Sequence, residues 1–195
     1  MARRKKGLSF YSKERKVNKG LIAEIFSWIF WGLAMVLAAF VFMYCFGIRT
    51  DMSGASMKPT LTNGQKVLMN RFVYYVSEPK SGDVIVFLPN GNTGSHYYIR
   101  RVIAGPGETI RIEDGVIYVD GFFYEDGFFY DKIADAGIAE NDIVLGEDEY
   151  FVLGDNRNDS EDSRSSNIGI VRREYIEGRV WFKFSDGNMQ MGLIK

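Results

Sequence analysis

The stretch Asp51-Met-Ser-Gly-Ala-Ser-Met-Lys-Pro-Thr-Leu61 begins four residues after the end of a long apolar run. Within it, Ser56 follows the small, flexible pair Gly54-Ala55 and precedes a turn that contains Pro59. A serine held on a fixed backbone in this way is exposed as a nucleophile must be, but the same residues also suit an ordinary polar turn. The stretch alone leaves both interpretations open, and the rest of the sequence has to decide between them.

The apolar run covers Ile25 to Gly47, twenty-three residues without a charged side chain. As a helix it is about 35 Å long, which is enough to cross the hydrocarbon core of a bilayer. It is too long for the apolar part of a cleavable signal peptide, and no small-residue cleavage site follows it. We therefore expect a transmembrane anchor over residues 21–47, preceded by a tail of residues 1–20.

The charged residues are distributed unevenly on the two sides of this run. Of the 24 basic and 25 acidic residues, eight basic residues and Glu14 lie within residues 1–20, and Glu24 lies between 21 and 47. Residues 48–195 therefore hold the remaining 16 basic and 23 acidic residues. Because basic segments stay in the cytoplasm, this distribution predicts a cytoplasmic amino terminus and a main domain outside the cell membrane. It is a topology signal and does not indicate a nucleic-acid partner.

The chain has one cysteine and one histidine, which excludes several kinds of site. Cys45 lies inside the apolar run, so no intramolecular disulfide is possible. A zinc site of Cys and His is implausible, and a Ser-His-Asp triad would rest wholly on His96. His96 lies four residues before Arg100, about 13 Å along an extended strand, and we expect it to be a surface or loop histidine. No metal ion and no organic cofactor is indicated.

Residues 48–195 consist of short apolar segments separated by turns rich in glycine. The pattern predicts a mainly β domain of antiparallel sheets, with no clear amphipathic helix. We expect a loose tail at its end and strands at Asp83–Phe87, Tyr97–Ile103, Glu108–Ile112, Gly115–Val119, Tyr150–Leu153 and Arg179–Phe184. The third and fourth of these segments should form a hairpin that turns near Asp114-Gly115.

One of these segments carries a charge among apolar residues. In a strand, side chains two residues apart share a face, so Arg100 lies with Tyr98 and Val102. A buried charge on such a face needs a partner or a task.

A short aromatic repeat follows the hairpin, with Phe122-Phe123 and then Phe128-Phe129 six residues later. We expect the two clusters to be opposed strands in the core. The alternative is an apolar lip that dips into the outer leaflet beside the anchor.

Four separated stretches together resemble one family, the type I signal peptidases, which are membrane-anchored serine proteases that remove signal peptides from exported proteins. The stretches are Ser56–Leu61, Gly82–Phe87, Tyr98–Ile103 with Gly105-Pro-Gly107, and Gly154–Arg164, and their order, spacing and preceding anchor are similar to those of the family. The resemblance, to the compact bacterial form, implies antiparallel sheets of the signal-peptidase type behind one transmembrane helix. It also implies a single-pass protein of the plasma membrane, whose partners are the lipid bilayer and the signal peptides of exported preproteins.

The resemblance also implies roles for single residues. Ser56 would be the nucleophile, and its backbone N–H would donate to the oxyanion. The family's base is a lysine kept neutral by burial, at the position of Arg100, where Ser160 would orient it. The supporting residues would be Asp162 with Arg164 as an ion pair and Asp155 with Arg157 in a turn. The substrate-binding residues would be Gly54, Ala55, Met57, Ile85 and Ile99.

Arg100 departs from the family pattern. Arginine does not lose its proton at neutral pH, since its pKa stays above about 12, so Arg100 cannot serve as a general base. Burial of its guanidinium also requires a partner, and we expect Asp162 or Ser160 to supply it.

Three interpretations of Arg100 stay open. In the first, the protein is a signal peptidase with another base, although Lys58 should point away from the site. In the second, it is an inactive relative that keeps the peptide cleft and acts as a binding or assembly factor for exported proteins. In the third, Arg100 is a substitution in an active enzyme. A different class, a tethered β domain that presents its aromatic clusters to a partner, predicts no cleft beside Ser56.

Overall fold

The computed structural model describes residues 19–125, 131–185, 187 and 191–194. The chain divides into two units, Met1–Val41 and Phe42–Lys195. In the described part of the chain, one helix, α1 (Lys19–Phe46), is long and apolar enough to cross a membrane. The apolar helix expected from the sequence is therefore present.

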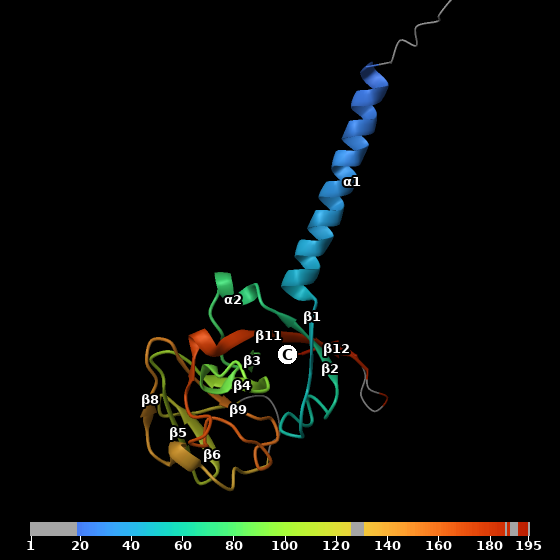
Figure 1. Cartoon of the computed structure of the whole chain (residues 1–195). Coiled ribbons are helices and arrows are strands. Elements are labelled where there is room, and N and C mark those ends of the chain that lie inside the picture. Colours follow the sequence, from blue (N-terminus) through green and yellow to red (C-terminus); the bar gives the residue numbers. More distant parts are fainter. Residues whose placement is uncertain (1–18, 126–130, 186, 188–190, 195) are drawn as a thin grey trace, which may run out of the picture. The chain divides into compact units, whose positions relative to one another are not determined.

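The second unit is built on a large antiparallel sheet (Figure 1). Along this sheet the strands follow the order β1 (Ile48–Asp51), β2 (Lys66–Asn70), β11 (Ile176–Lys183), β3 (Val84–Phe87), β4 (Tyr98–Ala104), β9 (Glu149–Leu153) and β10 (Val171–Arg172), and β12 (Gly192–Leu193) pairs with β11. Short helices connect strands in the described part of the domain, namely α2 (Val73–Val76), η1 (Pro89–Gly91), η2 (Gly137–Glu140) and η3 (Arg173–Tyr175). The expected mainly β, antiparallel domain is confirmed.

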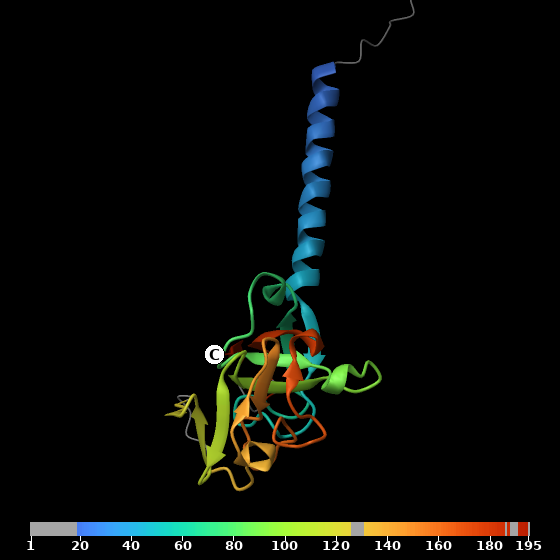
Figure 2. The same cartoon turned by 90° about the vertical axis from the view of Figure 1, so that its left-hand side faces the viewer.

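A second, smaller antiparallel sheet lies at one end of the domain, on the far side from β1 and β2 (Figures 1 and 2). Its strand order is β7 (Phe122–Phe123), β6 (Val116–Val119), β5 (Thr109–Glu113) and β8 (Ile143–Val144). The β5–β6 hairpin turns at Asp114 and Gly115, which both have positive φ angles, 51° and 78°. This is the backbone that a tight two-residue hairpin turn requires, and it explains why Asp-Gly predicted the turn correctly.

Strand β4 holds the domain together because both of its faces are buried. Ile99 packs in a core cluster with Met57 and Leu61, so the segment after Ser56 is fixed by apolar contacts. Val102 packs in a second cluster against β3 and β9. Ile103 packs in a third cluster that joins β4 and β9 to the small sheet. The strand that carries Arg100 is thus rigidly placed between three apolar clusters.

The expectation that the aromatic repeat forms core strands is wrong for its first half. Phe122 and Phe123 are 77% and 64% exposed, because they form the two-residue strand β7, which among the described residues is an edge of the small sheet. Tyr124 instead packs against the core beneath the small sheet. The second cluster, Phe128-Phe129, lies outside the described residues. The expected loose tail is also corrected, since β12 pairs with β11 and Ile194 is buried.

Phe151, on β9, is fully buried in the cluster that joins β4 and β9 to the small sheet. Replacing it by alanine should destabilise the domain by about 3–5 kcal/mol, because it leaves a cavity in this cluster. The matched variant Val144→Ala, on the exposed edge strand β8, should change stability by less than about 0.5 kcal/mol. The measurement is the thermal unfolding midpoint of the full chain in detergent. Equal shifts for the two variants would contradict the placement of Phe151 in the core.

Candidate active site

Ser56 lies in the turn region after β1, in the wall of a cavity of about 320 Å³. Its side chain is mostly buried, with the residue 7% exposed. Among the described residues, neither its hydroxyl nor its backbone N–H has a hydrogen-bond partner. The other lining residues are Met52, Ser53, Gly54, Ala55, His96, Tyr97, Tyr98, Ile99, Arg100, Asp159 and Glu161. Acyl-transfer chemistry would require the hydroxyl as nucleophile and the N–H as a donor to the oxyanion, and neither group is engaged in another hydrogen bond.

The backbone at Ser56 is held by the loop that follows β9. The Asn156 N–H donates to the Ser56 carbonyl oxygen at 2.9 Å, and Asn156 Nδ2 donates to the Ala55 carbonyl oxygen at 3.3 Å. Gly154 lies so close that an added Cβ would be 2.5 Å from the Ser56 carbonyl oxygen and 2.2 Å from Ser160 Oγ. Only glycine fits this position, because the Ser56 carbonyl oxygen and the Ser160 side chain both pack against it.

A buried ion pair joins the four stretches that carry the resemblance. Arg101 Nε donates to Asp155 Oδ1 at 2.8 Å and Nη2 donates to Oδ2 at 2.7 Å, with both side chains almost wholly buried. Arg101 Nη1 also donates to the Gly82 carbonyl oxygen at 2.8 Å, and the Thr60 hydroxyl donates to Asp155 Oδ2. One bidentate pair therefore ties the segment after Ser56 to β3, β4 and the loop after β9.

Arg100 is buried, but its partners differ from those expected. Its Nε and Nη2 donate to the Glu161 carbonyl oxygen at 2.9 and 2.6 Å, and its Nη1 donates to the Ile99 carbonyl oxygen at 2.6 Å. The guanidinium also lies over the Tyr98 ring, 5.1 Å from its centroid. The expectation that Asp162 or Ser160 accepts a hydrogen bond from Arg100 is wrong, because main-chain oxygens take that place. Asp162 acts on the guanidinium through its charge alone.

Burial lowers the pKa of Arg100, and the nearby charges of Asp162 and Glu161 act in the opposite direction. An arginine whose pKa is lowered in this way still keeps its proton at neutral pH. Burial, followed by the hydrogen bond to Glu161, raises the pKa of Tyr98, so its phenol also stays protonated. Neither side chain is able to accept a proton from Ser56.

In the loop from Ser160 to Arg164, the Asp162 carboxylate has several polar partners, whereas the Ser160 hydroxyl has none among the described residues. Asp162 and Arg164 form the ion pair implied by the resemblance, with Nε–Oδ1 at 2.8 Å, and Asp162 Oδ2 accepts the Gly154 N–H at 3.1 Å. The Ser160 Oγ is buried and has no hydrogen-bond partner in the described chain. An unsatisfied buried hydroxyl costs about 1–3 kcal/mol, and Arg100 does not donate to it.

The remaining candidates fall into two groups. Gly54, Ala55 and Ile99 line the Ser56 cavity. Met57 and Ile85 do not line it, because both side chains are fully buried in core clusters. Arg157 is buried in the turn after Asp155. Within the residues that the structure describes, no group of three or more His, Cys, Asp or Glu side chains is placed to hold a metal ion.

Sequence reasoning missed three contributors to this site. Arg101 was overlooked although it shares a strand face with Ile99 and Ile103, the same signal that drew attention to Arg100. His96 is an exposed loop residue as expected, yet it lines the Ser56 cavity together with Tyr97, the next residue along the chain. Glu161 accepts the hydrogen bonds of Arg100 through its main-chain oxygen, and a pattern of side chains in the sequence does not reveal such a contact.

Comparisons with known proteins agree on one family. Residues 23–185 match the family model described as "Signal peptidase, peptidase S26". The chain is similar to Signal peptidase I T of Bacillus subtilis (strain 168), with 30% identity over 173 residues that cover 79% of this chain and 83% of that protein. It is also similar to Signal peptidase I of Bacillus licheniformis, with 28% identity over 190 residues, 89% of this chain and 94% of that protein. A crystal structure of a signal peptidase I from Enterococcus faecalis superposes with a TM-score of 0.43 at 26% identity, over 53% of this chain and 97% of that one.

Replacing Asp155 by asparagine should destabilise the domain by about 3–5 kcal/mol, because the Arg101 guanidinium then stays buried without a counter-charge. The double variant Arg101→Met/Asp155→Leu removes both charges and should recover most of this loss. Thermal unfolding of the full chain in detergent measures both.

The matched control for this pair is Glu113→Gln, which breaks an exposed ion pair with Arg111 and should cost less than about 1 kcal/mol. If the double variant loses as much stability as the single variants Arg101→Met and Asp155→Leu lose together, the two side chains are not coupled.

Proposed function

Because the chain belongs to the signal peptidase family, peptidase S26, we propose that it acts as a signal peptidase I-type serine endopeptidase on the signal peptides of exported preproteins. The observation that supports this most strongly is Ser56 itself. It lies in a cavity beside β4 with both its hydroxyl and its N–H unengaged, on a backbone fixed by Asn156 and Gly154.

In this proposal the Ser56 oxygen attacks the scissile carbonyl carbon and forms an acyl-enzyme, and the amine of the mature protein leaves with a proton. The Ser56 N–H donates to the oxyanion, and Gly54 adds no side-chain donor. Small substrate side chains are accommodated against Gly54, Ala55 and Ile99, which line the cavity. Water then releases the signal peptide from Ser56.

The weak step is the removal of the proton from Ser56. Arg100 occupies the position at which the family resemblance implies a lysine base, and it keeps its proton and donates to Glu161 and Ile99. The unsatisfied Ser160 hydroxyl beside the Ser56 backbone supports a site shaped for an amine at position 100. We propose that Arg100 makes proton removal, and hence cleavage, slow in this chain.

The placement of the reaction follows from the anchor. We propose that residues 1–20 lie in the cytoplasm, residues 21–47 cross the plasma membrane, and residues 48–195 form the peptidase domain on the outer side. The basic tail and the apolar helix support this orientation. The bilayer and the signal peptides are then the partners, and no nucleic acid is involved.

A second candidate function is favoured by one observation, the three hydrogen bonds from Arg100 to main-chain oxygens. They fix the guanidinium in a pose that leaves the cavity beside Ser56 open but without a base. A protein in this state would bind signal peptides without cleaving them and would act as a binding or assembly factor for exported proteins.

Replacing Arg100 by lysine should raise cleavage of a preprotein after a small-x-small site by roughly 10²–10⁴-fold, the usual contribution of a general base. Burial at position 100 lowers the pKa of a lysine below its ordinary value of about 10.4 and makes it a competent base. The control Arg100→Met removes the guanidinium without supplying a base and should stay as slow as the unaltered protein. Cleavage is measured with the full chain in vesicles.

Adding Ser56→Ala to the Arg100→Lys background should abolish the gained cleavage, because the nucleophile is lost. If the Arg100→Lys variant is inert while signal-peptide binding persists in the Ser56→Ala variant, the chain is a binding factor and not a peptidase. Cleavage that survives Ser56→Ala would exclude Ser56 as the nucleophile.

A further inference from the structure

The cavity beside the candidate nucleophile has a lining of two kinds. One part is small or apolar and consists of Gly54, Ala55 and Ile99. Another part is acidic, because Asp159 and Glu161 also line the cavity. Both acidic residues are exposed, so their carboxylates are open to a ligand. The proposed cleavage reaction uses neither of them.

The two carboxylates differ in their partners. Glu161 accepts a hydrogen bond from the Tyr98 hydroxyl at 3.1 Å and one from Asn167 Nδ2 at 3.2 Å. Both donors are neutral, so Glu161 is fixed in place and keeps its charge. The Asp159 carboxylate has no hydrogen bond or ion pair with any residue that the structure describes. Asp159 is therefore a charge without a counter-charge in the cavity lining.

The charges of this lining do not cancel. The two carboxylates are opposed by the guanidinium of Arg100, and the other lining residues are neutral when His96 is uncharged, which leaves one negative charge in excess. Asp162 and Arg164 also act on Arg100 from outside the lining, but they form an ion pair with each other and add no net charge. The cavity thus favours a positively charged ligand group.

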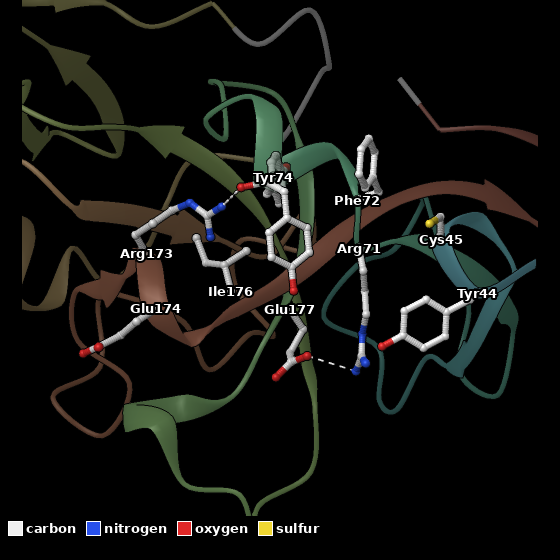
Figure 3. A pocket seen from close by; sticks show the side chains of 10 residues that line it. Tyr44, Cys45, Arg71, Phe72, Tyr74, Arg173, Glu174, Ile176 and Glu177 are labelled. Atoms are coloured by element: carbon white, nitrogen blue, oxygen red, sulfur yellow. Dashed lines mark hydrogen bonds and ion pairs between the residues drawn. The ribbon is translucent and has the colours of Figure 1, made fainter. Parts of the chain in front are cut away.

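A second cavity of the domain, of about 290 Å³, serves as a comparison (Figure 3). Its charged lining residues are Arg71, Arg173, Glu174 and Glu177. Arg71 and Glu177 face each other in Figure 3 and form an ion pair at 2.9 Å. The two positive and two negative charges of this cavity cancel. The cavity beside Ser56 differs from it in its excess of negative charge.

An extended peptide would place different side chains against the two kinds of lining. Ser56, which is 7% exposed and has a hydroxyl without a partner among the described residues, marks where the scissile bond would lie. Side chains of an extended chain alternate between two faces, so the two small residues of a small-x-small site share one face and x points the other way. If the small side chains pack against Gly54, Ala55 and Ile99, x is directed away from them, toward the polar lining.

We propose that Asp159 and Glu161 give this site a preference for signal peptides with lysine or arginine at x, the residue between the two small ones. The proposal rests on the proposed function, since it takes the Ser56 cavity as the place where a signal peptide binds. Asp159 contributes most of the preference, because the Glu161 carboxylate already has two donors. The two residues determine specificity and take no part in bond breaking.

The proposal is tested by peptide binding to the Ser56→Ala variant of the full chain in detergent, so that no peptide is cleaved. Two labelled signal-peptide segments are compared, identical except for Ala-Lys-Ala or Ala-Gln-Ala at the cleavage site. The lysine peptide should bind up to about fivefold more tightly, the upper range for an exposed ion pair. The difference should shrink at high salt, because salt screens exposed charges.

Adding Asp159→Asn should remove most of this difference. The matched control is Glu140→Gln, which removes an exposed carboxylate that does not line the cavity and should leave the difference unchanged. Adding Arg100→Met instead should enlarge the difference, because it removes the one positive charge of the lining. Equal effects of Asp159→Asn and Glu140→Gln would overturn the proposal. A lysine that strengthens binding only when it follows the cleavage bond would overturn the assignment to x.

The same peptides separate this proposal from the proposed function. Binding that does not depend on x would contradict the charge preference and leave the cavity as the signal-peptide site. Failure of both peptides to bind would contradict both proposals. In the Arg100→Lys variant, cleavage of the lysine substrate should show a lower KM with kcat unchanged, because the carboxylates contribute to binding and not to the chemical step. A change in kcat alone would contradict this role.

Discussion

The buried pair of Arg101 and Asp155 is the constraint on which the rest of the site depends. Removing two charges from water costs several kcal/mol per ion, and such a pair persists only when its geometry is close to ideal. Here two parallel hydrogen bonds join the guanidinium to the carboxylate. The guanidinium also donates to the Gly82 carbonyl oxygen, and the carboxylate accepts from the Thr60 hydroxyl. The same contacts fix the loop after β9 against the turn that carries Ser56, so the structural pair and the candidate nucleophile cannot move independently.

Two adjacent arginines on β4 have opposite tasks. Arg101 faces Asp155 and belongs to the framework, whereas Arg100 faces the Ser56 cavity and the Glu161 loop. Their different surroundings follow from the alternation of side chains along a strand. A lysine at position 100 would be a single point of charge, able to reach a hydroxyl, while the guanidinium fork matches carbonyl oxygens and leaves Ser160 unsatisfied. The four stretches that carry the family resemblance are therefore joined in this chain by the pair of Arg101 and Asp155. We propose that the replacement of the base by Arg100 is the departure that matters for function.

The sequence was sufficient for features that depend on local pattern. The apolar helix, the strands around Val84–Phe87 and Tyr98–Ala104 and the turn at Asp114-Gly115 follow from hydropathy, alternation and glycine. Features that depend on long-range contacts were missed. Phe122 and Phe123 look like core residues, but strand order places them at an edge. The partners of Arg101 and Arg100 lie 54 and 61 residues away in the chain, and one of them is a main-chain oxygen.

The most direct test of this account is a crystal structure of the Arg100→Lys variant. The account predicts that the amine nitrogen introduced at position 100 lies within hydrogen-bond distance, about 2.6–3.2 Å, of both Ser56 Oγ and Ser160 Oγ, with the pair of Arg101 and Asp155 unchanged. An amine that turns instead to the Glu161 carbonyl oxygen, with Ser160 still unsatisfied, would contradict it.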